Sequence, residues 1–143
     1  MLDTTFYPPD FKGPYPHMFP EDLKIWERFL TKYGALYNGF YYDVTVGQPV
    51  EVPSYIKENY KRSAEILSKL RIDAVGEREN TIDLIEVKPI GNLSALGQLL
   101  TYHKHYISDY EPSKPVRMVL VAGEINPNVE TVLEDHAIVY IQV

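Results

Sequence analysis

The sequence contains no cysteine, and this excludes disulfides, zinc–thiolate sites, iron–sulfur clusters and thiol nucleophiles together. It also contains no apolar run that approaches the roughly 20 residues needed to span a bilayer. The first residues, Met1 to Thr4, lack the basic and then apolar pattern that begins a secretory signal. We therefore expect a soluble, intracellular (cytoplasmic) protein that has no membrane partner.

An excess of positive charge is missing as well. The chain has 14 Lys and Arg against 20 Asp and Glu, and its formal net charge is -6. The basic field that is typical of a nucleic-acid-binding protein is therefore absent from the molecule as a whole. The charge is uneven, however: residues 53–72 carry five basic and two acidic side chains, whereas residues 73–90 carry five acidic and two basic ones. This pattern suits a metal site that faces a phosphate backbone, and it is equally typical of a solvated surface.

Proline and aromatic residues are concentrated at the N-terminus. Residues 1–20 contain five of the 11 prolines, and five aromatic residues lie between them. Because proline fixes φ and removes a hydrogen-bond donor, we expect an extended arm here rather than a helix. The arm either lies on the surface of its own domain or docks on a partner, which would be a second copy or a larger assembly. A chain of 143 residues is long enough for one domain, and we assign residues 21–143 to it.

The spacing of apolar residues predicts helices that alternate with strands. In chain order, the expected elements are a helix at 21–33, a strand at 40–46, a helix at 53–69, a hairpin of strands at 70–75 and 81–87, a helix from 92 or 94 to 106, a strand at 116–122, a helix at 126–134 and a strand at 137–143. This order indicates an α/β fold with a mixed β-sheet flanked by helices. In the first helix, the 3–4 spacing of Leu23, Trp26, Leu30 and Tyr33 defines the expected inward face.

The predicted hairpin brings charged residues into apolar strands. Side chains alternate along a strand, so Glu86 and Lys88 share one face, and a suitable register would place Asp73 opposite Glu86. Paired carboxylates are hard oxygen ligands that suit Mg²⁺, and a neighbouring lysine can hold a metal-bound water. The alternative is an edge strand whose Glu–Lys ion pair protects it from pairing with other chains.

The next helix carries Gln98 and Tyr102, which are four residues apart and therefore lie on one face. Together with Asp73 and the triplet Glu86-Val87-Lys88, this pair resembles the PD-(D/E)XK (restriction-endonuclease-like) nuclease superfamily. The similarity is to the branch that has an added Gln-x-x-x-Tyr motif. The resemblance covers roughly residues 21–122 in the order of elements, and it implies a core of helix, three strands, helix and strand.

The resemblance also implies roles for these residues. Asp73, Glu86 and the main-chain carbonyl of Val87 would hold Mg²⁺ or Mn²⁺, and Lys88 would orient or activate the attacking water. Gln98 and Tyr102 would contact the substrate phosphate or brace the site.

Many members of this superfamily have a further glutamate on the first helix, and Glu27 is the candidate because it lies beside the expected apolar face. Two features depart from the family pattern. No proline precedes Asp73, and the helix at 53–69 has the position of an insertion. Because of this insertion, Glu58 or Glu65 are alternatives to Glu27.

We therefore expect a metal-dependent nuclease that hydrolyses phosphodiester bonds in DNA, with RNA not excluded. Lys57, Lys61 and Arg62 are the candidate contacts to nucleic-acid phosphates, although a basic stripe is also typical of a solvated helix face. The alternative function is a non-cleaving domain that keeps the nuclease fold as a structural or DNA-docking component of a larger viral (phage) or mobile-element assembly.

Overall fold

The structure is a computed structural model that describes residues 5–48, 54–55, 60 and 70–143. Its helices and strands are, in chain order, α1 (Pro20–Tyr33), the 3₁₀ helix η1 (Gly34–Leu36), β1 (Gly39–Val46), β2 (Leu70–Glu77), β3 (Ile82–Gly91), α3 (Leu93–Tyr110), β4 (Val116–Ile125), α4 (Pro127–Asp135) and β5 (Ile138–Gln142). The predicted helix at 53–69 lies almost entirely outside the described residues. The other predicted elements are present in the predicted order.

The strands form one five-stranded sheet in the order β1-β2-β3-β4-β5. β2 runs antiparallel to both of its neighbours, β1 and β3, whereas β3, β4 and β5 run parallel. The predicted α/β fold with a mixed sheet is therefore confirmed. The strand order also tests the alternative that the strand with Glu86 and Lys88 lies at the edge of the sheet. It does not, because β3 is the central strand. Glu86 and Lys88 therefore do not protect an edge strand.

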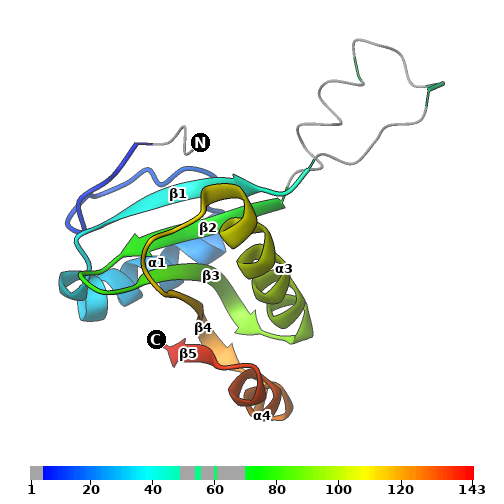
Figure 1. Ribbon diagram of the computed structural model, residues 1–143. Coiled ribbons are helices and arrows are strands. Elements are labelled where there is room, and N and C mark those ends of the chain that lie inside the picture. Colours follow the sequence, from blue (N-terminus) through cyan, green and yellow to red (C-terminus); the bar gives the residue numbers. More distant parts are fainter. Residues whose placement is uncertain (1–4, 49–53, 56–59, 61–69) are drawn as a thin grey trace.

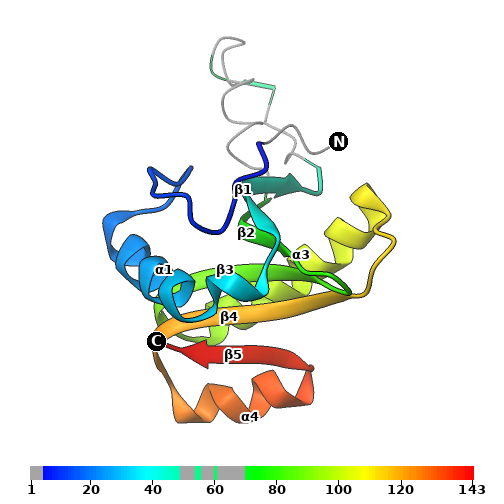
Figure 2. The same cartoon turned by 90° about the vertical axis from the view of Figure 1, so that its left-hand side faces the viewer.

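Helices cover both faces of the sheet (Figures 1 and 2). On one face α1 packs its buried residues Ile25, Trp26 and Phe29 against the sheet. On the other face α3 and α4 share an apolar cluster with β4. Asn92 begins α3 as its N-cap, with the side-chain oxygen accepting a hydrogen bond from the Ala95 N–H. Within the described residues, no helix combines the length and the apolar character needed to cross a membrane.

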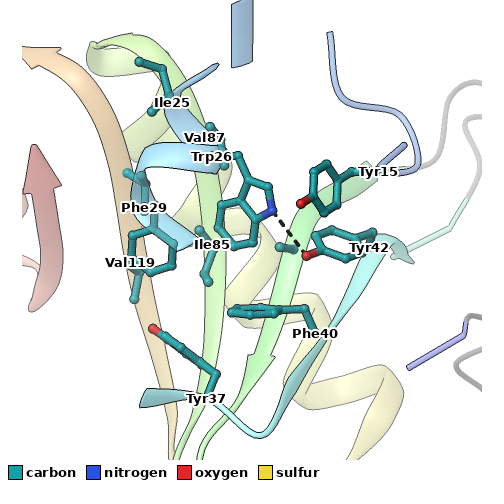
Figure 3. Packing of buried hydrophobic residues seen from close by; sticks show 12 residues of the cluster. Tyr15, Ile25, Trp26, Phe29, Tyr37, Phe40, Tyr42, Ile85, Val87 and Val119 are labelled. Carbon is teal, nitrogen blue, oxygen red and sulfur yellow. Dashed lines mark hydrogen bonds between the residues drawn. The ribbon is translucent and has the colours of Figure 1, made fainter. Parts of the chain in front are cut away.

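Aromatic side chains dominate the core on the α1 side (Figure 3). The Trp26 indole N–H donates a hydrogen bond of 3.2 Å to the Tyr42 hydroxyl. The Trp26 ring packs edge-on against Phe40, with 5.1 Å between the ring centroids. Such edge-to-face pairs contribute about 0.5–1.5 kcal/mol each beyond the burial of area. They hold α1 against β1 and thereby fix the position of the first turn of the helix.

The N-terminal arm packs on its own domain over its described part. Tyr7 and Phe40 exchange two main-chain hydrogen bonds of 2.9 Å, which join the arm to β1. The Tyr15 ring is 8% exposed and lies 5.2 Å from the ring of Tyr42. The aromatic residues of the arm therefore extend the core, in agreement with the first of the two roles that the sequence left open.

Candidate functional site

The site lies where β2 and β3 separate. Their antiparallel ladder runs from Glu77 opposite Ile82 to Ala74 opposite Ile85. One further step in this register brings Asp73 opposite Glu86, which is the register that the sequence left as a condition. At this point the ladder stops, and the Val87 N–H donates a hydrogen bond of 2.8 Å to Oδ2 of Asp73. A carboxylate thus takes the place of a main-chain partner and is held against β3.

Glu86 is buried beside Asp73. Its side chain is 3% exposed, and Oε1 lies 3.3 Å from Nζ of Lys88. The other oxygen, Oε2, is buried and has no hydrogen-bond partner among the described residues. Burial raises the pKa of Glu86 to about 8, and the negative charge of Asp73 adds to this effect. Burial also raises the pKa of Asp73 to about 6, although the hydrogen bond from Val87 opposes the change. The two carboxylates therefore repel each other, and a cation between them would relieve the repulsion.

The donor set fits a hard divalent cation. Asp73 and Glu86 supply carboxylate oxygens, one of which has no partner in the described structure. In an extended strand the N–H and C=O of one residue point to the same side, so the Val87 carbonyl is directed toward the side on which Asp73 lies. Among the described residues, no group of three or more Asp, Glu or His side chains could hold a metal ion. A metal here would therefore have two carboxylates, a main-chain oxygen and water as ligands, a set that suits Mg²⁺.

The predicted pair on α3 is joined by a hydrogen bond, and Tyr102 lies within electrostatic reach of the carboxylates. The Gln98 side-chain amide donates a hydrogen bond of 3.3 Å to the Tyr102 hydroxyl. Tyr102 is buried, and its pKa is raised by burial and then by the negative charges of Glu86 and Asp73. The negative charges of both carboxylates therefore act on the Tyr102 hydroxyl group, and the hydrogen bond from Gln98 holds this group in place.

The acidic residue that α1 brings to the site is Asp22. Burial raises the pKa of its carboxyl group, while the positive charge of Lys88 lowers it. The charge of Asp22 in turn raises the pKa values of Asp73 and Glu86. Asp22 thus belongs to the same electrostatic cluster. The sequence did not reveal this role, because an acid in the first turn of a helix is already explained by the helix dipole.

The structure does not bring Glu27 into the cluster. Its side chain is exposed and lines a cavity of about 590 Å³ between α1 and the N-terminal arm. The predicted inward face of α1 is confirmed in part. Leu23, Leu30 and Tyr33 pack against the core beside Trp26, but the most deeply buried residues are Ile25, Trp26 and Phe29, so the buried face is rotated toward Phe29. This rotation turns Glu27 away from the core and keeps Asp22, which is one turn before Trp26, on the buried side.

The remaining predicted residues lie outside the described part of the chain. The candidate phosphate contacts Lys57, Lys61 and Arg62 are among them, and so are the alternative acids Glu58 and Glu65. Their roles stay predictions.

Asp83 is a second buried acid of the hairpin, but it is fully paired. Arg117 donates two hydrogen bonds of 2.7 Å to its carboxylate, and the Tyr37 hydroxyl donates a third of 2.6 Å. Asp83 is thus satisfied, whereas Glu86, three residues later, keeps an oxygen without a partner among the described residues. The contrast separates a structural ion pair from a candidate binding site on one strand.

Comparison with known proteins supports the fold. No protein-family model matches the sequence, and no curated protein matches it either. Among solved structures, the chain is similar to the crystal structure of a repair endonuclease from Pyrococcus abyssi, with a TM-score of 0.50 and 16% sequence identity. The match covers 89% of this chain and 49% of the endonuclease, so this chain spans about half of that protein's length. At this identity the likeness concerns the fold, and the chain has a nuclease-like α/β fold.

Proposed function

We propose that this protein is a metal-dependent nuclease of the PD-(D/E)XK type that hydrolyses phosphodiester bonds in DNA. The observation that carries the proposal is the adjacent pair Asp73 and Glu86, with an oxygen of the buried Glu86 unpartnered in the described structure and Lys88 beside it. A buried carboxylate oxygen without a hydrogen-bond partner is costly to folding. The presence of this pair in the centre of a nuclease-like sheet is explained if it binds a cation that the reaction needs.

Each group then has a role that follows from its position. Asp73, Glu86 and the carbonyl of Val87 would hold Mg²⁺ or Mn²⁺. When bound, such an ion stabilises negative charge on the phosphate and lowers the pKa of water. The Lys88 ammonium group, 3.3 Å from Glu86, would orient the attacking water and donate a hydrogen bond to it.

The outer residues would position this set. Gln98 donates a hydrogen bond to the Tyr102 hydroxyl, and the two side chains would brace the site or contact the substrate phosphate. Asp22 approaches from α1 and would take the place that the resemblance assigns to a glutamate of the first helix. Its carboxylate interacts electrostatically with Lys88 and would hold the ammonium group of that lysine in place.

The test is a cleavage assay with a matched lysine control. The purified protein is incubated with supercoiled plasmid and with linear DNA in Mg²⁺ or Mn²⁺, alongside Lys88→Ala and Lys114→Ala. Both lysines are about equally exposed and each pairs with a glutamate, at 3.3 Å for Lys88 and 3.2 Å for Lys114. Lys114, however, lies with Glu77 at the opposite end of the β2–β3 ladder.

We expect metal-dependent cleavage that is lost in Lys88→Ala and retained in Lys114→Ala. Equal activity of the two variants would show that Lys88 has no part in the reaction. The absence of cleavage by folded protein in either metal would refute the nuclease and favour a non-cleaving DNA-docking component.

A further inference from the structure

Basic residues that form no ion pair within the described structure gather on one side of the molecule. The chain has 14 Lys and Arg, and four of them lie outside the described residues. Of the other ten, four form ion pairs with acids, namely Arg71, Lys88, Lys114 and Arg117. Four of the remaining six line two neighbouring hollows at the outer surface of α1, namely Lys12, Lys24, Arg28 and Lys32.

Three of these side chains form a row along α1, which we call the α1 basic stripe. Lys24, Arg28 and Lys32 follow one another at intervals of four residues, so they share one face, with about 6 Å of helix rise between neighbours. All three are exposed, and together they line a hollow of about 420 Å³. The stripe lies on the side of the helix opposite Trp26 and Phe29, which are buried.

The second hollow extends this surface toward the N-terminal arm. It is the cavity of about 590 Å³ between α1 and the arm, and Lys12 lines it. Glu27 and Thr31 line both hollows, so the two adjoin each other on α1. The lining of the two hollows contains four basic residues and two acidic ones, Asp10 and Glu27. This surface is therefore positive, although the chain as a whole has a net charge of -6.

The stripe begins at the end of α1 that packs near Lys88. A Cβ placed on Gly123 would meet the Ile25 side chain at 2.9 Å and the Pro89 carbonyl at 3.0 Å. Pro89 directly follows Lys88, so the start of α1 lies against the part of β3 that carries this lysine. Lys24, the first residue of the stripe, directly precedes Ile25. The last residue of the stripe lies about 12 Å further along the helix, so the stripe leads away from the candidate site.

We infer that the α1 basic stripe binds successive phosphates of the DNA strand that leaves the candidate site. This inference rests on the proposed nuclease function and names the path of its substrate. A nucleic acid carries one negative charge per nucleotide at regular intervals, and a row of cations at regular intervals is complementary to it. Contacts to phosphates position a nucleic acid but do not read its sequence. The stripe would therefore fix the direction of the DNA on the protein without selecting a sequence.

The salt dependence of DNA binding tests the inference with two double variants that remove the same charge. Fluorescence anisotropy of a labelled DNA is measured in Ca²⁺ between about 50 and 200 mM salt. Arg28→Gln/Lys32→Gln removes two cations of the stripe. Arg78→Gln/Lys104→Gln is the matched control, because neither residue forms an ion pair within the described structure or lines either hollow. Thermal melting confirms that each variant is folded.

We expect the stripe variant to lose both affinity and salt dependence. Each lost phosphate contact reduces the slope of log K against log salt by about 0.7–0.9, so two contacts reduce it by about 1.4–1.8 and weaken binding about tenfold or more. The control should keep the slope of the parent and an affinity within about twofold, because charges more than about 10 Å from the DNA are screened. Lys24→Gln/Arg28→Gln is a second variant and should act like the first.

Two results would overturn the inference. One is an equal change of slope, or no change, in the stripe variants and the control. The other is labelled poly-glutamate that binds the parent as tightly as DNA of equal charge and is lost in Arg28→Gln/Lys32→Gln, which would assign the stripe to an acidic protein. Cleavage of DNA by a parent whose stripe variants bind DNA normally would refute the inference and leave the nuclease function intact. Loss of binding in the stripe variants of a protein that cleaves no DNA would support the binding surface and refute the nuclease alone.

Discussion

Replacing Glu86 with glutamine should stabilise the metal-free protein at pH 8. The reason is the buried negative charge, since Glu86 is 3% exposed and lies beside Asp73. Glutamine has nearly the same shape, and its amide group can donate a hydrogen bond to the Asp73 carboxylate. The variant therefore removes the repulsion without opening a cavity.

The magnitude follows from the pKa of Glu86, which burial and the charge of Asp73 raise from 4.5 to about 8. Each tenfold change in an ionisation constant corresponds to about 1.4 kcal/mol, so the cost of ionising this group in the folded protein is at most roughly 4–5 kcal/mol. Loss of the ion pair with Lys88 and the burial of an amide offset much of this. We expect a net gain of about 1–2 kcal/mol, which raises Tm by about 3–8 °C in a chain of this size.

The sign of the pH dependence provides a second check. Because the pKa is raised on folding, the folded protein binds the proton more tightly than the unfolded chain does. The stability of the parent protein therefore falls as the pH rises from about 4.5 to about 8. Glutamine does not titrate, so the advantage of Glu86→Gln should be small at pH 5 and should grow toward pH 8.

The assay is thermal or urea unfolding in EDTA between pH 5 and pH 8.5. Glu77→Gln is the control, because Glu77 is 38% exposed and pairs with Lys114, and we expect it to change stability by less than about 0.5 kcal/mol. A Glu86→Gln variant that is less stable than the parent at pH 8, or whose advantage does not depend on pH, would refute the reasoning. Mn²⁺ at about 100 times its Kd should stabilise the parent by about 2.7 kcal/mol and the variant far less.

Three further predictions concern the surroundings of the pair. Asp22→Asn should lower the cleavage rate by about 10–100-fold, as is typical for groups that orient a metal site, whereas Glu27→Gln should leave it within twofold in the same assay. Asp83→Ala should destabilise the protein by about 2–4 kcal/mol in urea unfolding, because Arg117 and the Tyr37 hydroxyl lose their acceptor; a smaller loss than 1 kcal/mol would contradict this. Trp26→Ala should cost about 3–5 kcal/mol by the same measurement, and a change near zero would show that the α1 face is assigned incorrectly.

Local patterns predicted the elements and the hairpin. Short apolar segments on either side of a polar turn indicated β2 and β3, whereas the register that brings Asp73 next to Glu86 was left as a condition, and the structure supplies it. The start of α3 was equally local, since its N-cap Asn92 is the first of the two starting positions, 92 and 94, that the sequence offered. These features depend on neighbours within a few residues, and such neighbours are visible in the sequence.

The rotation of the buried face of α1 toward Phe29 could not be predicted in this way, because apolar residues lie on both sides of the helix. Trp26 and Phe29 pack on the sheet, while Leu30 lines the cavity under the N-terminal arm together with Phe11 and Tyr15. Periodicity shows that a helix has apolar residues, but it does not show which element covers each of them. The N-terminal arm covers the apolar residues of α1 that do not face the sheet, such as Leu30. This contact joins two segments whose packing the sequence pattern alone does not show.

Long-range pairing explains the other differences. The central position of β3 follows from its parallel pairing with β4, and the satisfied state of Asp83 depends on Arg117, which is 34 residues away. No local signal shows which of two acids on one strand, Asp83 or Glu86, meets an arginine. The sequence thus predicted that acids gather on the hairpin, but the fold determines which of them keep an unused oxygen.

The early end of the β2–β3 ladder divides the sheet into two parts. Beyond Ala74, β2 continues with β1, while β3 continues with β4 as far as Gly91. A cation held by Asp73 and Glu86 would connect the two parts at the point where they separate. Its arrival should therefore slow hydrogen exchange of the amides on both sides of that point, and catalysis would be linked to the mechanical stiffness of the sheet.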